Sequence, residues 1–103
     1  MNETINKLQH ELGIEFYYIS RDEGVCPCVV YNYKKELLIS DMRKESSSHD
    51  FFFILIINEK VNKTVEKFEE ILLNNLFRNI AVNQSVTTKE GFIQVSITAS
   101  KNI

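Results

Sequence analysis

Apolar residues recur at intervals of three and four in two segments of the chain, and this spacing predicts two helices. The first runs from Thr4 to Leu12, and Gly13 follows it where a helix end often takes a left-handed conformation. The second runs from Asn62 to Leu76 and carries charged residues opposite its apolar face. The predicted core positions are Ile5, Leu8, Leu12, Val65, Phe68, Leu72 and Leu76, and the face with Glu66, Glu69 and Glu70 is interpreted as solvent-exposed.

Segments rich in β-branched and aromatic residues, separated by turn-forming residues, predict the strands. A polar turn at 34–36 separates the second strand from a short third one, and a turn at 89–91 joins the last two. The strands span residues 14–20, 28–33, 37–39, 51–57, 80–88 and 92–99. Residues 40–50 are charged and serine-rich without an apolar period, so they are expected to form a mobile loop or arm.

These elements predict one α+β domain covering residues 1–103, because a chain of this length is too short for two separate cores. Two helices are expected to pack on a mostly antiparallel sheet of five to six strands, in the order α-β-β-β-β-α-β-β.

The apolar run from Phe51 to Ile57 is predicted to be a central strand that is apolar on both faces. Since alternate side chains point to opposite faces, Phe52, Ile54 and Ile56 lie on the face opposite Phe51. Two helices cover only one face of such a sheet, so this second face needs another cover. We expect a second subunit to provide it. The alternative is that the closing hairpin or the N-terminal strand folds over it.

The charge of the chain excludes some classes of partner. A formal charge of −2 leaves no surplus of cations for a run of phosphates, so direct nucleic-acid binding is not expected. The longest apolar run has seven residues, far fewer than the roughly twenty that a membrane-spanning helix needs. The polar N-terminus does not resemble a secretory signal, and a cytoplasmic protein is expected.

Two cysteines flank the only proline of the chain, in the stretch Cys26-Pro27-Cys28. They supply at most two ligands for zinc, and the two histidines, His10 and His49, lie far away in the predicted elements. Cysteines two apart in an extended segment point to opposite faces, which disfavours a disulfide. No metal or cofactor is expected. Pro27 instead suits the start of a strand in which Cys28 is a small apolar residue.

Asp41, His49 and Asp50 are the only residues that suggest an acid–base pair. A serine-rich loop offers neither the fixed geometry nor the desolvated pocket that catalysis needs. The sequence also contains no nucleophile elbow and no phosphate-binding loop. No catalytic residues are assigned, and the chain is not expected to be an enzyme.

The layout of the chain resembles that of phage tail terminator proteins, also called tail completion or tail-to-head joining proteins. The similarity lies in a short N-terminal helix and strand, a proline before an apolar strand, a polar loop, a strand, an acidic helix and a closing hairpin. In this chain the proline is Pro27, the following strand contains Val29, Val30 and Tyr31, and the loop is 40–50. The seven-residue apolar run departs from the more alternating strand expected of such proteins, and the two cysteines have no counterpart.

The resemblance implies a structural protein of a phage or prophage-derived tail. A closed ring of about six copies would cap the tail tube and join it to the head connector. It implies assembly in the host cytoplasm and a final place in the virion or tail particle. The expected subunit interface is Phe52, Ile54 and Ile56, and the expected docking arm contains Arg43, Lys44 and Glu45. The alternative is a small dimeric α+β module that binds a ligand or acts as an adaptor.

Overall fold

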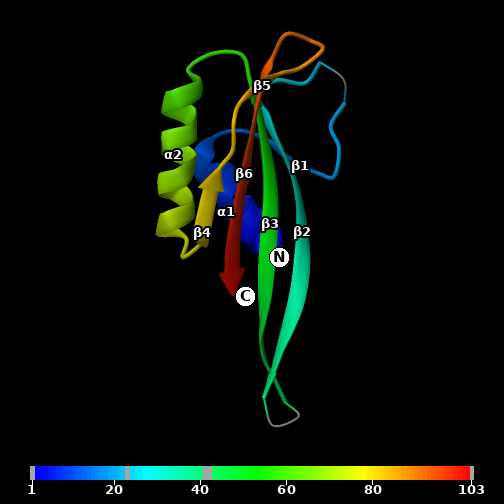
Figure 1. The fold of residues 1–103 in the computed structure, drawn as a ribbon, viewed down its shortest axis with the longest axis vertical. Coiled ribbons are helices and arrows are strands. Elements are labelled where there is room, and N and C mark those ends of the chain that lie inside the picture. Colours follow the sequence, from blue (N-terminus) through cyan, green and yellow to red (C-terminus); the bar gives the residue numbers. More distant parts are fainter. Residues whose placement is uncertain (1, 23, 41–42, 103) are drawn as a thin grey trace.

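The computed structural model of the chain describes residues 2–22, 24–40 and 43–102. It has two layers, a six-stranded sheet and two helices that pack on one of its faces (Figure 1). The helices are α1 (Asn2–Leu12) and α2 (Val61–Asn74). The strands are β1 (Phe16–Tyr18), β2 (Cys28–Ser40), β3 (Arg43–Ile57), β4 (Arg78–Val82), β5 (Val86–Thr87) and β6 (Ile93–Asn102). The predicted α+β fold class is confirmed.

The sheet has the strand order β1-β2-β3-β6-β4. The short strand β5 is not part of this order and pairs with β6. β1 runs parallel to β2, and the other pairs of described strands are antiparallel. Three strands precede α2 and three follow it. β3 is the middle strand, so the prediction that residues 51–57 lie at the centre of the sheet is confirmed.

β2 and β3 form one long hairpin, and the sequence did not predict it. The turn expected at 34–36 and the loop expected at 40–50 are wrong, because Lys35 pairs with His49 and Glu36 with Ser48. The backbone hydrogen bonds of this antiparallel ladder outweigh the low strand propensity of the charged side chains. Asp41 and Met42 lie outside the described residues.

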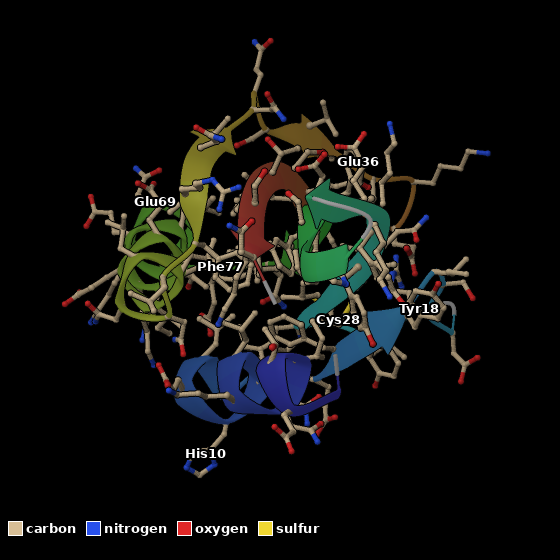
Figure 2. The ribbon with its side chains drawn as sticks, turned by 90° about the horizontal axis from the view of Figure 1, so that it is seen from below. His10, Tyr18, Cys28, Glu36, Glu69 and Phe77 are labelled. Carbon is tan, nitrogen blue, oxygen red and sulfur yellow. The ribbon has the colours of Figure 1, made fainter. Side chains whose placement is uncertain are left out.

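The core lies between the helices and the inner face of the sheet. Phe51, Phe53 and Leu55 are at most 1% exposed and face α1 and α2, which confirms the predicted alternation in β3. The predicted core residues of both helices are confirmed except Leu76. Viewed from below, Phe77 lies between the two layers, whereas His10 points away from the body of the protein (Figure 2). Within the core, the Phe53 ring meets the Phe68 ring edge-on at 5.2 Å between centroids.

α2 ends in a Schellman motif that places Leu76 outside the core. The N–H of Phe77 donates to the carbonyl of Leu72 at 3.0 Å, and the N–H of Leu76 donates to that of Leu73 at 3.1 Å. This motif requires a left-handed residue, and Leu76 has φ 65° and is 80% exposed. The prediction that Leu76 belongs to the apolar face of the helix is therefore wrong, because the helix ends before it. Gly13 takes the corresponding position after α1, as predicted, with φ 76°.

No helix in the described part of the chain is both long enough and apolar enough to cross a membrane.

Candidate assembly surface

The outer face of the sheet, opposite the helices, is covered at one end and open at the other. Along β3, Ile56 is 4% exposed, Ile54 is half-buried and Phe52 is 50% exposed. The expectation that Ile56 belongs to a subunit interface is therefore wrong, because the chain itself covers this residue. Phe52 and Ile54 remain available on the surface.

Two loops provide the cover over Ile56. Beneath the loops lies a second apolar cluster that consists of Ile56, Cys28 and Val30. Cys26 and Phe92, which belong to the loops, pack against this cluster. One loop connects β1 to β2, and the other connects β5 to β6. The alternative expected from the sequence was that the closing hairpin or the N-terminal strand folds over the second face. At this end of the sheet the cover comes from the turn of the closing hairpin and from the loop after the N-terminal strand.

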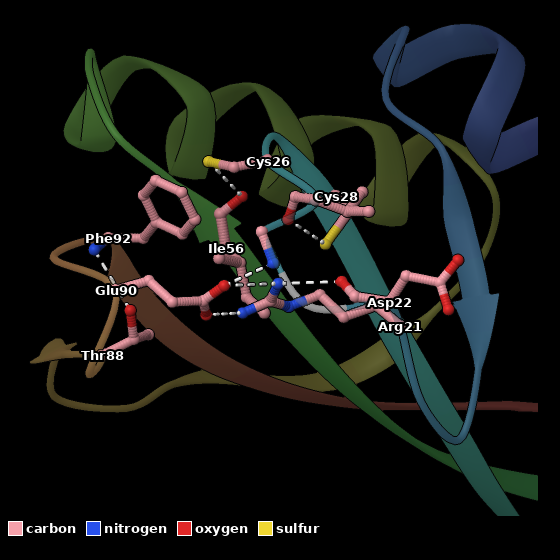
Figure 3. Close-up of polar contacts among 10 residues, drawn as sticks. Arg21, Asp22, Cys26, Cys28, Ile56, Thr88, Glu90 and Phe92 are labelled. Carbon is pink, nitrogen blue, oxygen red and sulfur yellow. Dashed lines mark hydrogen bonds and ion pairs between the residues drawn. The ribbon is translucent and has the colours of Figure 1, made fainter.

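Glu90 connects the two loops (Figure 3). Its carboxylate accepts hydrogen bonds from the guanidinium of Arg21 and from the backbone N–H of Gly24. The hydrogen bond from Arg21, together with the one from Gly24, lowers the pKa of Glu90 despite some desolvation. The same interaction raises the pKa of Arg21. Both groups are therefore charged at neutral pH, and the loops are held together by an ion pair.

Cys28 lies beneath this cover, and Cys26 is a half-buried part of it. The Sγ of Cys26 is 3.7 Å from the carbonyl oxygen of Ile56, and the Sγ of Cys28 is 3.6 Å from that of Val25. Burial raises the pKa of both thiols, and Arg21 offsets only part of this effect. The described residues include no group of three or more His, Cys, Asp and Glu side chains placed to bind a metal ion. Cys28 is fully buried at the start of β2, as the sequence predicted.

The open end of the outer face contains an apolar groove of about 270 Å³. Its lining residues are Ile19, Val30, Tyr31, Asn32, Phe52 and Ile54, and we call it the outer groove. It is bordered by the loop after β1, which supplies Ile19, and by the middle of the β2–β3 hairpin, which supplies the rest. An exposed phenylalanine beside an exposed isoleucine is unusual for a surface that faces only water.

Ile19 is held in a strained conformation at the rim of the outer groove. Its φ is 69°, a value that β-branched residues rarely adopt. The N–H of Ser20 donates to the carbonyl of Tyr18 at 2.8 Å, which closes a tight γ-turn around Ile19. The side chain is 61% exposed, so burial offsets little of this strain. The residue types around Ile19 do not predict this conformation, because none of them requires a positive φ at this position.

The other candidate residues are spread over different parts of the fold. Arg43, Lys44 and Glu45 lie at the start of β3, in the far part of the long hairpin. His49 is on the inner face of the sheet, stacked on Phe51, whereas the carboxylate of Asp50 accepts a hydrogen bond from the Ser100 hydroxyl at 2.7 Å. Neighbouring strand residues point to opposite faces, so His49 and Asp50 do not form one site. Asp41 lies outside the described residues.

The chain matches no protein-family model, and the search of curated proteins finds no match.

Proposed function

We propose that the protein is a structural subunit of a phage or prophage-derived tail, a tail terminator. A closed ring of about six copies would cap the tail tube and present a docking surface to the head connector. The observation that carries the proposal is the outer groove, in which Phe52 and Ile19 are exposed and Ile19 is strained. Backbone strain of this kind is typically retained at functional surfaces. An apolar surface that is exposed to water is suited to contact with a protein partner.

The long hairpin supports the same proposal. β6 ends at Asn102, which pairs with Ser48, so residues 37–40 and 43–47 pair only with each other in the described part of the chain. The molecule is elongated as a result, with extents of 51 × 25 × 24 Å. A two-stranded extension has little stability of its own, and contact with another protein stabilises it. We assign to this extension, which includes Arg43, Lys44 and Glu45, the role of the arm that meets the tail tube or the head connector.

The first test is the native mass of the purified protein, measured by sedimentation velocity over a range of concentrations. A ring of about six 12.0 kDa chains would have a mass of about 72 kDa. The second test is the addition of the protein to polymerising tail-tube protein, with tube lengths measured by electron microscopy. A terminator should stop growth and appear as a density at one end of each tube.

A variant pair tests the outer groove in both assays. Phe52→Lys places a charge in the groove, and Val82→Lys places the same charge at an exposed apolar residue of β4, where Val82 is 42% exposed. Phe52→Lys should abolish the ring and the capping of tubes, and Val82→Lys should leave both intact. Thermal unfolding should show that both variants are folded. A protein that neither forms a ring nor caps tubes contradicts the proposal, and a stable dimer with a copurified ligand would favour a ligand-binding module.

A further inference from the structure

A single carboxylate connects the two loops that cover the second apolar cluster (Figure 3). Glu90 lies in the β5–β6 loop, and it accepts hydrogen bonds from Arg21 and from the N–H of Gly24 in the β1–β2 loop. No other hydrogen bond or ion pair joins the described residues of these two loops. We call the contacts of Glu90 with Arg21 and Gly24 the clasp.

The two loops differ in their internal hydrogen bonds. In the β5–β6 loop, the N–H of Thr88 donates to the carbonyl of Phe92 at 2.8 Å, and the N–H of Phe92 donates to the Thr88 hydroxyl at 3.1 Å. Beyond the turn at Ile19, the described part of the β1–β2 loop has one internal backbone hydrogen bond, from Val25 to Asp22 at 3.3 Å. Segments with few backbone hydrogen bonds open at a lower free energy than the whole fold does. The β1–β2 loop is therefore the one expected to move.

The clasp lies at the surface of the protein. Arg21 is partly exposed and Glu90 is exposed, and ion pairs in contact with water contribute little to stability. None of the residues of the clasp belongs to the core between the helices and the sheet. Loss of the clasp would therefore release the loop and leave this core intact.

The cluster beneath the loops is continuous with the outer groove. Val30 belongs to the cluster and also lines the groove, and Ile54 lines the groove and packs against the cluster. Val30 pairs with Ile54, and Cys28 pairs with Ile56 two residues along the same strands. Residues two apart in a strand share a face, so these two pairs are adjacent rows of one apolar surface. The loops cover the row of Cys28 and Ile56.

The strained residue Ile19 stands at the start of the β1–β2 loop. Its side chain lines the outer groove, and its N–H donates to the carbonyl of Tyr31 at 2.9 Å. A β-branched residue is unfavourable at positive φ, and this cost is relieved if the loop after it is free to take another course. The strain at Ile19 thus favours opening of the loop, and the clasp opposes it.

We propose that the clasp opens in the folded protein, and that its opening uncovers Cys28 and Ile56 and joins them to the outer groove as one longer apolar surface. The structure shows the closed state, in which the groove ends at Val30 and Ile54. The clasp then controls how much of the outer face a partner can contact. This inference rests on the proposed function, in which the outer groove is the assembly surface, and it assigns a control of that site.

The thiol of Cys28 reports the opening. In the variant Cys26→Ser, Cys28 is the only thiol of the chain, and the serine hydroxyl keeps a donor near the carbonyl of Ile56. Its reaction with an aromatic disulfide is followed at about pH 8, at a concentration where the protein is monomeric. The reference is Val95→Cys in a chain with Cys26→Ser and Cys28→Ala, because Val95 is buried in the core under the helices.

The protection of each thiol is its reaction rate in the urea-unfolded chain divided by its rate in the folded chain. For Val95→Cys, the protection should match the unfolding equilibrium of the same variant. For Cys28 it should be smaller than that equilibrium predicts by about tenfold or more, and it should change little in dilute urea, because a local opening exposes little surface. If Cys28 is protected as fully as Val95→Cys and has the same urea dependence, only unfolding of the whole chain reaches it and the inference is wrong.

Two variants remove the clasp from either side. Glu90→Gln and Arg21→Gln, each in the Cys26→Ser chain, should lower the protection of Cys28 about fivefold or more. Burial is the main cause that raises the pKa of Cys28, whereas Arg21 lowers this pKa and Glu90 raises it. The two substitutions therefore change the ionisation of the thiol in opposite directions, and a faster reaction in both reports opening.

The matched control is Glu70→Gln, which removes the same charge at an exposed residue of α2. It should leave the protection of Cys28 unchanged. The inference fails if either clasp variant has the protection of this control.

The longer apolar surface has a readout of its own. The dye ANS binds exposed apolar surface, so its fluorescence should be stronger with Glu90→Gln than with the wild type or with Glu70→Gln. Circular dichroism should show that all three proteins are folded. Equal fluorescence would mean that loss of the clasp does not lengthen the outer groove, and it would overturn the inference.

These measurements use the single chain and do not depend on tail assembly. If Cys28 shows the local opening but the wild type neither forms a ring nor caps tubes, the clasp stands and the terminator function is wrong. If the wild type caps tubes but Cys28 is reached only by unfolding of the whole chain, the terminator proposal stands and the inference about the clasp is wrong.

Discussion

Replacement of Leu76 by glycine should stabilise the fold, although it removes a large apolar side chain. Leu76 has φ 65° at the position of the Schellman motif where glycine is preferred. A left-handed conformation costs an L-residue roughly 1–2 kcal/mol, and glycine does not incur this cost.

Two smaller effects oppose the gain. Leu76 is 80% exposed, so only about a fifth of the roughly 2 kcal/mol of leucine burial is lost. Glycine also gives the unfolded chain more freedom, by about 0.5 kcal/mol. The net expectation for Leu76→Gly is a gain of about 0.1–1 kcal/mol, with a midpoint near 0.6 kcal/mol, or an increase in Tm of about 3 °C for a domain of this size.

The assay is thermal and urea unfolding followed by circular dichroism, at a concentration where sedimentation shows a single chain, because association would itself raise Tm. Leu73→Gly is the matched control, since Leu73 is also exposed but lies within the helix. Glycine costs about 1 kcal/mol inside a helix, so Leu73→Gly should lower the stability. If both substitutions lower Tm equally, the left-handed conformation of Leu76 carries no cost and the reasoning is refuted.

Three further predictions concern the core, the thiols and the loop contact. Phe53→Ala should lower the free energy of unfolding by about 3–5 kcal/mol in urea titrations, because Phe53 is 1% exposed at the centre of the aromatic core; a loss under 1 kcal/mol would contradict this. Cys26 and Cys28 should react with a thiol reagent at pH 8 more slowly in the folded than in the urea-unfolded protein, because burial raises the pKa of both; equal rates would contradict the burial. Because Arg21 lowers the pKa of Glu90, the ion pair stabilises the fold above the ordinary carboxyl pKa and is lost as the pH falls through the lowered value. Glu90→Gln should therefore lower Tm at pH 7 but not at the acidic end of a pH series, and a constant difference would argue against the ion pair.

The local pattern of the sequence predicted the helices, the central strand and most of the core. Spacings of three and four residues mark the buried side of each helix, and the apolar run at 51–57 marks the middle strand. These features depend on neighbouring residues only. The polar half of the long hairpin was missed, because its strands are specified by pairing between residues 36–40 and 43–48 and not by side-chain type.

The candidate surface was predicted in part, for a related reason. Alternation in β3 identified Phe52 and Ile54 as residues of the second face, and both lie in the outer groove. Ile56 was assigned to the same surface and is buried, because the loop that covers it is held by a contact between Arg21 and Glu90, 69 residues apart. A contact between residues so far apart in the sequence cannot be predicted from the local pattern of apolar and polar residues. The left-handed conformations of Ile19 and Leu76 also depend on the surrounding hydrogen bonds, and neither residue type suggests them.

Ile19 and Leu76 link the strain in the backbone to the proposed assembly. Each exposes an apolar side chain from a left-handed residue, one beside the outer groove and one at the end of α2. Each conformation costs roughly 1–2 kcal/mol, a sizeable part of the 5–15 kcal/mol that keeps a typical domain folded. Glycine would remove that cost at both positions, but at Ile19 it would also remove a side chain that lines the outer groove. We therefore expect Ile19→Gly to raise the stability of the single chain and to weaken the proposed assembly, whereas Leu76→Gly should raise the stability only.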